Sequence, residues 1–243
     1  MIFLVRQSAE YGGNLATSNK IKDNIGAAYY SDGQGDGNVA LGISAGSNGG
    51  GTAVGSFTFS AYASFAGGLG SNATVPGSAV LGYEAVDNGA SEFSYASGAN
   101  IGKGKQNWAT VVLSQTTSGS SAVNLTVDGS AANASNCANL VAGQHEAIDV
   151  RMIVTDITTA KQYAAYWTAH LYTRSAAVST VLIDGATTAV APDSTRSNGT
   201  WTGASASIAA DTTNGCLTVK FTPPTGNSDT LHAVATVSGP QVQ

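Results

Sequence analysis

VALGISAGSNGGGTAVGSFTFSAYASFAGGLGSNATVPGSAVLGYEAVDNGASEFSYASG, which spans residues 39–98, is the stretch that decides the fold. It repeats an aliphatic residue, a glycine and, three positions after the glycine, a small residue. The copies are Leu41-Gly42…Ala45, Val54-Gly55…Thr58, Leu69-Gly70…Ala73 and Leu81-Gly82…Ala85, with a degenerate copy at Ser97-Gly98. Successive glycines are 13, 15, 12 and 16 residues apart, a mean of 14. Because glycine admits the positive φ of tight turns, each unit is predicted to form a short strand, a turn and a second short strand.

A single unit of this kind is too thin to bury a core, so the units are expected to stack on one another along the chain. The stack is poor in charge. There is no Lys or Arg between Lys22 and Lys103, and no charged residue of either sign between Asp36 and Glu84. Because charges usually keep a monomer soluble, we expect several copies of the chain to pack side by side and bury these uncharged flanks.

Beyond Lys103 the pattern changes to alternation with period two, which is typical of half-buried strands. The predicted strands are 108–114, 122–127, 147–154, 162–173, 179–183, 205–210, 217–222 and 232–237. In the fourth of these the apolar positions are expected to run from Tyr163 through Trp167 to Leu171 on one face. Turn-forming dipeptides such as Asp128-Gly129 and Asn214-Gly215 separate the strands. Eight short strands with such turns predict an antiparallel sandwich.

The chain is therefore predicted to be all-β, with three regions. Residues 1–32 are interpreted as an N-terminal attachment arm, 33–104 as the stacked repeats and 105–243 as the sandwich. A net charge of −5 gives no reason to expect nucleic-acid binding. No apolar run reaches the roughly 20 residues of a membrane helix, so no membrane insertion is expected.

Two motifs suggest enzyme chemistry, but the repeats explain both. Residues 42–46 match the G-x-S-x-G string of hydrolases, and residues 68–73 match a dinucleotide-binding fingerprint. Pro76-Gly77 follows the second string too soon for a helix, and the first lies where glycine and serine are frequent. We predict no catalytic residues, no cofactor and no enzyme activity.

The metal and cysteine signals are weak. Residues 32–37 place aspartate oxygens and a glycine as at the start of a calcium loop, but Ile43 stands at the twelfth position, where the loop needs Glu. A solvated turn is therefore preferred to a calcium site, and no metal site is predicted. Cys137 and Cys216 form a disulfide only if their Cα atoms come within about 7 Å. Two free thiols are favoured, with the bridge left open.

A ligand site is suggested by an acid–aromatic cluster, Tyr83, Glu84 and Asp87. Aromatic rings stack on sugar faces and carboxylates accept hydrogen bonds from sugar hydroxyls, so these residues are candidates for contact with a host surface glycan. Acidic residues at repeat turns also serve simply to keep edges soluble, and this reading stays open.

Two stretches resemble known families. Residues 38–102 are similar to the head repeats of trimeric bacterial adhesins, which also occur in bacteriophage fibres as left-handed parallel β-rolls in threefold bundles. Residues 106–237 resemble a C-terminal domain of phage and prophage virion proteins that often directly follows such repeats. The matching segments of the second stretch are 124–129, 165–174, 210–219 and 233–237.

The resemblance implies a non-enzymatic virion protein: a homotrimeric fibre or spike, of tail-fibre type, that contacts the host surface. Its fold would be a parallel β-roll of about 14-residue repeats followed by an antiparallel β-sandwich. Residues 1–30 would attach it to other virion proteins. One alternative is a head fibre or capsid decoration protein whose arm grips the shell. A more remote alternative is a polysaccharide depolymerase.

Overall fold

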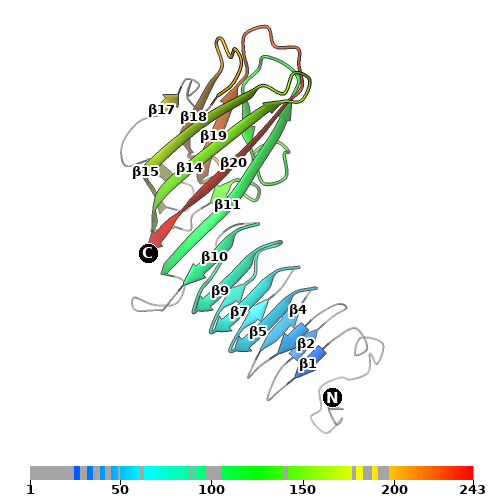
Figure 1. Cartoon of the computed structure of the whole chain (residues 1–243). Coiled ribbons are helices and arrows are strands. Elements are labelled where there is room, and N and C mark those ends of the chain that lie inside the picture. Colours follow the sequence, from blue (N-terminus) through cyan, green and yellow to red (C-terminus); the bar gives the residue numbers. More distant parts are fainter. Residues whose placement is uncertain are drawn as a thin grey trace.

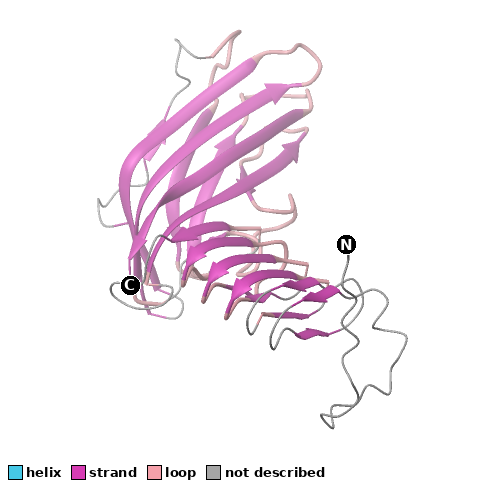
Figure 2. Cartoon of the chain, turned by 60° about the horizontal axis from the view of Figure 1, so that its bottom comes forward, coloured by secondary structure: helices cyan, strands magenta, loops and turns pink. Residues whose placement is uncertain are grey.

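The computed structural model describes residues 25–27, 32–34, 39–41, 45–48, 50–60, 63–87, 89, 91–96, 105–139, 142–176, 179–182, 188–190 and 197–242. Every regular element in these ranges is a β-strand, so the predicted all-β class is confirmed. Figure 1 shows small stacked strands, from blue to cyan, that lead into a larger body of long strands, from green to red. Figure 2 shows the same arrangement coloured by secondary structure. Among the described residues, no helix has the length and apolar character that a membrane crossing requires.

One sheet of eleven strands runs through both parts. Its first six strands pair in parallel, and we call them, together with the smaller sheet beside them, the ladder. The last five pair antiparallel and belong to what we call the body. In order across the sheet, the strands are β1 (Ile25–Ala27), β3 (Val39–Leu41), β5 (Thr52–Ser56), β7 (Phe65–Leu69), β9 (Ala79–Tyr83), β10 (Phe93–Ala96), β11 (Gln106–Thr117), β20 (Leu231–Val242), β14 (Gln144–Asp156), β15 (Gln162–Ala176) and β16 (Ser179–Leu182).

The second sheet of the ladder alternates with the first along the chain. Its parallel strands are β2 (Asp32–Gln34), β4 (Gly46–Asn48), β6 (Phe59–Ser60) and β8 (Asn72–Ala73). The space between the two sheets is filled by small side chains such as Ala53, Ala66 and Val80, all fully buried. Buried serines satisfy their hydroxyls on carbonyl oxygens, as when Ser64 Oγ donates to Ala73 O at 2.8 Å. A core this narrow accepts little beyond Ala, Val and Ser, which accounts for the composition of the repeats.

The register of the ladder corrects the predicted repeat. Gly55 pairs with Gly68 and Gly68 with Gly82, so the structural period is 13 and then 14 residues. The sequence alignment of Gly70 with Gly55 and Gly82 was wrong by two residues. Gly70 has a different conformation, with φ of +71° against +114° for Gly68, and it lies beside the Glu84 side chain. The pair Leu69-Gly70 imitates the repeat, while Gly67-Gly68 occupies its positions.

In the body, the antiparallel strands of the long sheet share a core with a five-stranded sheet. That sheet consists of β12 (Val123–Leu125), β13 (Ala138–Asn139), β17 (Thr188–Val190), β18 (Ser205–Asp211) and β19 (Cys216–Thr222). The largest fully buried side chains of this core include Tyr163, Tyr172 and Phe221. All eight strands predicted for this half are present, and β13 and β17 were not predicted.

The cysteines form a disulfide, so the preference for two free thiols was wrong. The Cα atoms of Cys137 and Cys216 are 6.0 Å apart, and both residues are buried. The cause is strand pairing: Asn139 in β13 lies opposite Cys216 in β19, which places the preceding Cys137 within bonding reach. Because β13 has only two residues, it is too short for an alternating pattern to predict a strand at this point.

The predicted attachment arm falls largely outside the described residues. Within its range, residues 25–27 form β1, which pairs in parallel with β3 and continues the long sheet. Residues 1–24 lie outside the description.

Candidate functional site

An exposed apolar patch covers the outer face of the long sheet. In β5 and β9 the second residue is buried and the third is exposed, and in β10 exposed and buried residues alternate. Leu81 pairs with Tyr95, and Tyr95 pairs with Trp108, so these side chains form one row across three strands. Their exposed fractions are 37%, 48% and 46%. Val54 and Phe93 add to the row's flanks, and Leu69 and Tyr83 pair at its edge.

The patch continues onto the body without a break in the sheet. Val112, on the same face of β11 as Trp108, is half exposed, and it pairs with Thr236 of β20. Val234, Ile153 and Tyr166 extend the exposed apolar surface across β20, β14 and β15. We call these four side chains, together with Trp108 and the six exposed apolar side chains of the ladder, the outer patch.

The outer patch is large for a surface open to water. Full burial of an aromatic side chain covers roughly 150–250 Å², so eleven partly exposed apolar side chains present roughly 800 Å² in all. The largest apolar patch on a typical monomer is about 300–600 Å². The outward positions of β5, β7, β9, β10 and β11 carry no charged residue. The arrangement therefore suits burial against another apolar surface.

The predicted glycan residues do not lie together. Tyr83 ends β9 and is exposed, whereas Asp87 is buried. The Asp87 carboxylate accepts hydrogen bonds from the backbone N–H of Thr74 at 2.9 Å, the N–H of Val75 at 2.6 Å and Ser78 Oγ at 2.5 Å. These bonds fasten one turn of the ladder to the next and occupy the carboxylate.

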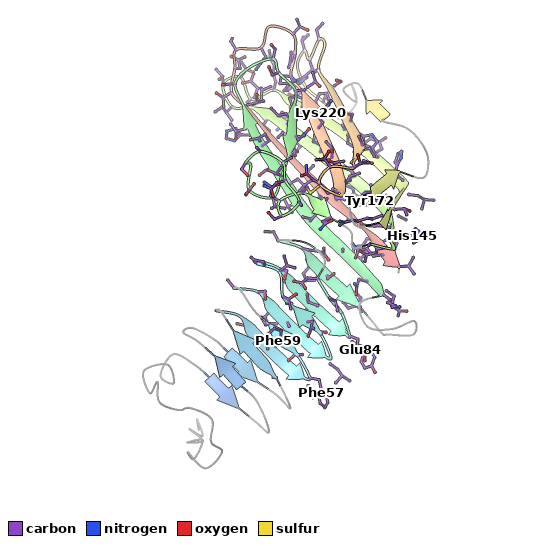
Figure 3. All side chains as sticks on the ribbon, turned by 180° about the vertical axis from the view of Figure 1, so that it is seen from behind. Phe57, Phe59, Glu84, His145, Tyr172 and Lys220 are labelled. Carbon is purple, nitrogen blue, oxygen red and sulfur yellow. A yellow bond between two sulfur atoms is a disulfide. The ribbon has the colours of Figure 1, made fainter. Side chains whose placement is uncertain are left out.

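Glu84 has a different environment from Asp87. Its backbone adopts a positive φ of 55°, and its N–H donates to Leu69 O at 2.7 Å. Figure 3 shows its side chain at the edge of the ladder. Tyr83 and Glu84 remain available for ligand contact at this edge, and their role in glycan binding stays a prediction.

A buried pair of carboxyl groups lies at the junction of ladder and body. Glu92, just before β10, and Glu146, in β14, line a small hollow together with Gln241 and Asn139. Glu92 accepts a hydrogen bond from Ser94 Oγ at 2.7 Å. Burial raises the pKa of Glu146 to about 8, and the charge of Glu92 contributes to the rise. Glu146 is therefore protonated at neutral pH.

This pair was not predicted from the sequence, because 54 residues separate Glu92 from Glu146. Each glutamate occurs in an ordinary strand-like pattern. Such a pattern does not distinguish a carboxyl group that points inward from a polar side chain that points to solvent. The antiparallel pairings of β10 with β11, of β11 with β20 and of β20 with β14 together bring them close.

The predicted calcium loop is described only in part. Asp32–Gln34 form β2, which pairs with β4, and residues 35–37 lie outside the description. Within the described part of the chain, no three His, Cys, Asp or Glu side chains gather as a metal site would require.

The dinucleotide-like string at residues 68–73 belongs to the ladder. No helix follows it, because Asn72–Ala73 form β8. The repeat-turn interpretation of this string is therefore confirmed. The hydrolase-like Ser44 lies outside the described residues.

We compared the chain with models of protein families, with curated proteins and with solved structures, and none of these comparisons gave a match.

Proposed function

We propose that this chain is a structural protein of a bacteriophage virion, a homotrimeric fibre or spike that contacts the host surface. In this proposal the ladder is a β-roll of about 14-residue repeats and the body is a β-sandwich. Three copies would lie side by side along the ladder. The observation that carries the proposal is the outer patch: an apolar face that is uncharged on the ladder strands and extends onto the body, where the exposed Arg151 pairs with Tyr166.

The size of the outer patch supports self-association. A specific interface removes about 800 Å² of surface from each partner, and the patch presents roughly this area. Burying it costs no desolvation of charge on the ladder strands, because none of their outward positions is charged. At about 25 cal/mol per Å², even a part of this area supplies several kcal/mol toward assembly.

The shape of the ladder supports a role as a rigid stalk. Every ladder strand is bonded to the strand of the next repeat, so extra repeats lengthen the stack without changing its cross-section. The long sheet then passes from β10 into β11, which fixes the body to the end of the stalk. Residues 1–30 would attach the stalk to other virion proteins.

The proposal is tested by two measurements. Light scattering of the purified chain is expected to give three times the mass of the 24.3 kDa monomer. Antibody labelling of virions, viewed by electron microscopy, is expected to mark the tail; a label on the head would support the head-fibre or capsid-decoration alternative. A stable monomer, or purified virions without the chain, would contradict the proposal.

The proposed role is non-enzymatic. Incubation of the protein with polysaccharide of the host, followed by size analysis of the polymer, is expected to leave the chain length unchanged. Shortened chains would instead support the depolymerase alternative.

A further inference from the structure

The end of the body farthest from the ladder carries a polar hollow. β11 pairs with β20 along its whole length, with Gln106 opposite Val242 at the ladder end and Thr117 opposite Leu231 at the far end. The turn between β14 and β15, the loop before β18 and the loop between β19 and β20 meet at this far end, at the top of Figure 1. They enclose a hollow that is open to solvent. Its wall includes Lys161, Thr200, Trp201, Pro224, Asn227 and Asp229.

The hollow is held by close packing between its loops. A Cβ on Gly199 would lie 2.6 Å from Cγ of Lys161, so the lysine stem rests directly on this glycine. Gly203 is equally close to Thr225, where an added Cβ would lie 2.9 Å from Oγ1. The side-chain oxygen of Asn198 accepts from the backbone N–H of Gln162 at 2.6 Å, which ties the loop to β15. A wall fixed in this way loses little entropy when a ligand binds.

The apolar side chains of the lining are Trp201, Pro224 and Leu231. Trp201 is buried beneath the hollow, and its indole N–H donates to Asn198 O at 2.9 Å. Its ring packs edge to face against Tyr163, with ring centroids 5.7 Å apart, and against Phe221 at 6.4 Å. Trp201 therefore belongs to the core and supports the hollow from below, while Pro224, which is only partly buried, is the apolar side chain that the hollow offers to a ligand.

The rim offers polar groups that the fold does not use. Asn227 donates its amide hydrogens to Asp229 O at 2.8 Å and Gly119 O at 3.3 Å, which leaves its side-chain oxygen as an acceptor. Asp156 also lines the hollow, but its carboxylate is buried and accepts from Thr159 Oγ1 and from the backbone N–H groups of Thr158 and Thr159. These bonds hold the pKa of Asp156 below the ordinary value. Within the described part of the chain, the Asp229 carboxylate makes no hydrogen bond.

This combination fits a sugar better than other small ligands. A carboxylate and an amide oxygen accept hydrogen bonds from neighbouring hydroxyls, an ammonium donates to ring or hydroxyl oxygens, and the Pro224 ring receives the apolar C–H face of a pyranose. A nucleotide or polyphosphate would meet one lysine beside the Asp229 and Asp156 carboxylates, which disfavours it. We infer that the hollow binds a saccharide unit of a host surface glycan.

This inference rests on the proposed function, in which the body of a trimeric fibre meets the host. Three hollows on one particle would act together, so a weak site in each chain suffices for firm attachment. The hollow is distinct from the predicted glycan residues Tyr83 and Glu84, which lie on the ladder.

The test uses the full chain on an array of immobilised bacterial surface polysaccharides. Binding to a subset of the glycans is expected, with at least a tenfold loss of signal for Asp229→Asn and for Lys161→Met. Both changes keep the shape of the side chain that contacts the loops. Lys220→Met is the matched control, since Lys220 is exposed on β19 (Figure 3), outside the hollow, and its change is expected to leave binding unaltered.

Binding to no glycan on the array, or binding that both hollow variants leave unchanged, would overturn the inference. Folding of each variant is checked by its melting temperature, which is expected to match that of the parent. The result is separable from that of the proposed function: mass and position on the virion report on the fibre, whereas the array reports on the hollow.

Discussion

Gly68 lies so close to Gly82 in the ladder that a Cβ on Gly68 would stand 2.0 Å from the carbonyl oxygen of Gly82. The same contact joins Gly55 to Gly68, at 1.8 Å, and Gly82 to Ala96, at 1.9 Å. These glycines also share a positive φ, between 114° and 132°. The column they form sets the spacing of successive repeats, because it lets one backbone rest directly on the next.

We therefore expect Gly68→Ala to destabilise the ladder by about 3 kcal/mol or more, through the clash with the backbone and the strained φ. Thermal unfolding followed by circular dichroism measures the effect. Gly119→Ala is the control, since a Cβ there meets no atom within 4 Å, and a change within about 0.5 kcal/mol is expected. Equal melting temperatures for the two variants would contradict the role of the column.

The disulfide between Cys137 and Cys216 closes a loop with a sequence separation of 79 residues. A cross-link over such a length stabilises a fold by about 4 kcal/mol in the chain-entropy picture. Reduction of the folded protein, or the double change Cys137→Ala and Cys216→Ala, is expected to lower the free energy of unfolding accordingly. Denaturant titration with and without reductant measures this, and the double variant should not respond to reductant. A parent protein that is equally stable in both conditions would show that the bridge contributes nothing.

Glu146 makes stability depend on pH in the neutral range. Its pKa is raised from 4.5 to about 8 in the folded protein by burial and by Glu92. Below pH 4.5 the group is protonated in both states and its contribution is fully present. Between pH 4.5 and pH 8 only the unfolded chain loses the proton. The free energy of unfolding therefore falls by about 1 kcal/mol per pH unit until the folded pKa of about 8 is passed.

Glu146→Gln is expected to remove this slope and to raise stability at pH 7, because a neutral amide of the same shape replaces a carboxyl that resists ionisation. Unfolding at several pH values between 5 and 9 measures the slope. Glu84→Gln, at the surface of the ladder, is the control and should keep it. If the Glu146→Gln protein and the parent show the same slope, the junction carboxyl is not its source.

The sequence predicted much of this fold because its signals were local. Glycine spacing predicted a stacked ladder, and alternation predicted eight of the strands of the body. The errors arose where a local pattern had two solutions. Leu69-Gly70 satisfied the aliphatic-glycine repeat, which Gly67-Gly68 does not, and only the contact between backbones of successive repeats selects Gly68.

A β-bulge caused a second error, in the strand that contains Trp167. The alternation predicted Leu171 on the same face as Trp167. The register between β14 and β15 shifts between Ile148 and Val150, so Tyr172 turns into the core and Leu171 is 44% exposed. Neither the disulfide nor the Glu92–Glu146 pair was predictable, because both depend on which distant strands become neighbours.

Asp87 gives a direct comparison between a structural and a surface carboxylate. Asp87→Ala leaves the N–H groups of Thr74 and Val75 without their acceptor, and we expect a loss of about 2–3 kcal/mol in the free energy of unfolding. Glu84→Gln is again the control, with a change within about 0.5 kcal/mol. Denaturant titration measures the free energy of unfolding of both variants. If the Asp87→Ala protein is as stable as the parent, Asp87 is again a candidate for ligand contact.

The outer patch predicts which single substitutions separate the chains. Tyr95 lies in the middle of the row formed with Leu81 and Trp108, so Tyr95→Asp would place a charge in the centre of the proposed interface without a partner. Burying such a charge costs several kcal/mol in each copy, and we expect light scattering to show the mass fall from three chains to one. Ile157→Asp changes a side chain that is more exposed, at 56%, but lies in the turn at the far end of the body, and its mass should stay that of the parent. Because the two variants introduce the same charge, a Tyr95→Asp protein that keeps the parent's mass would place the interface on another face of the molecule.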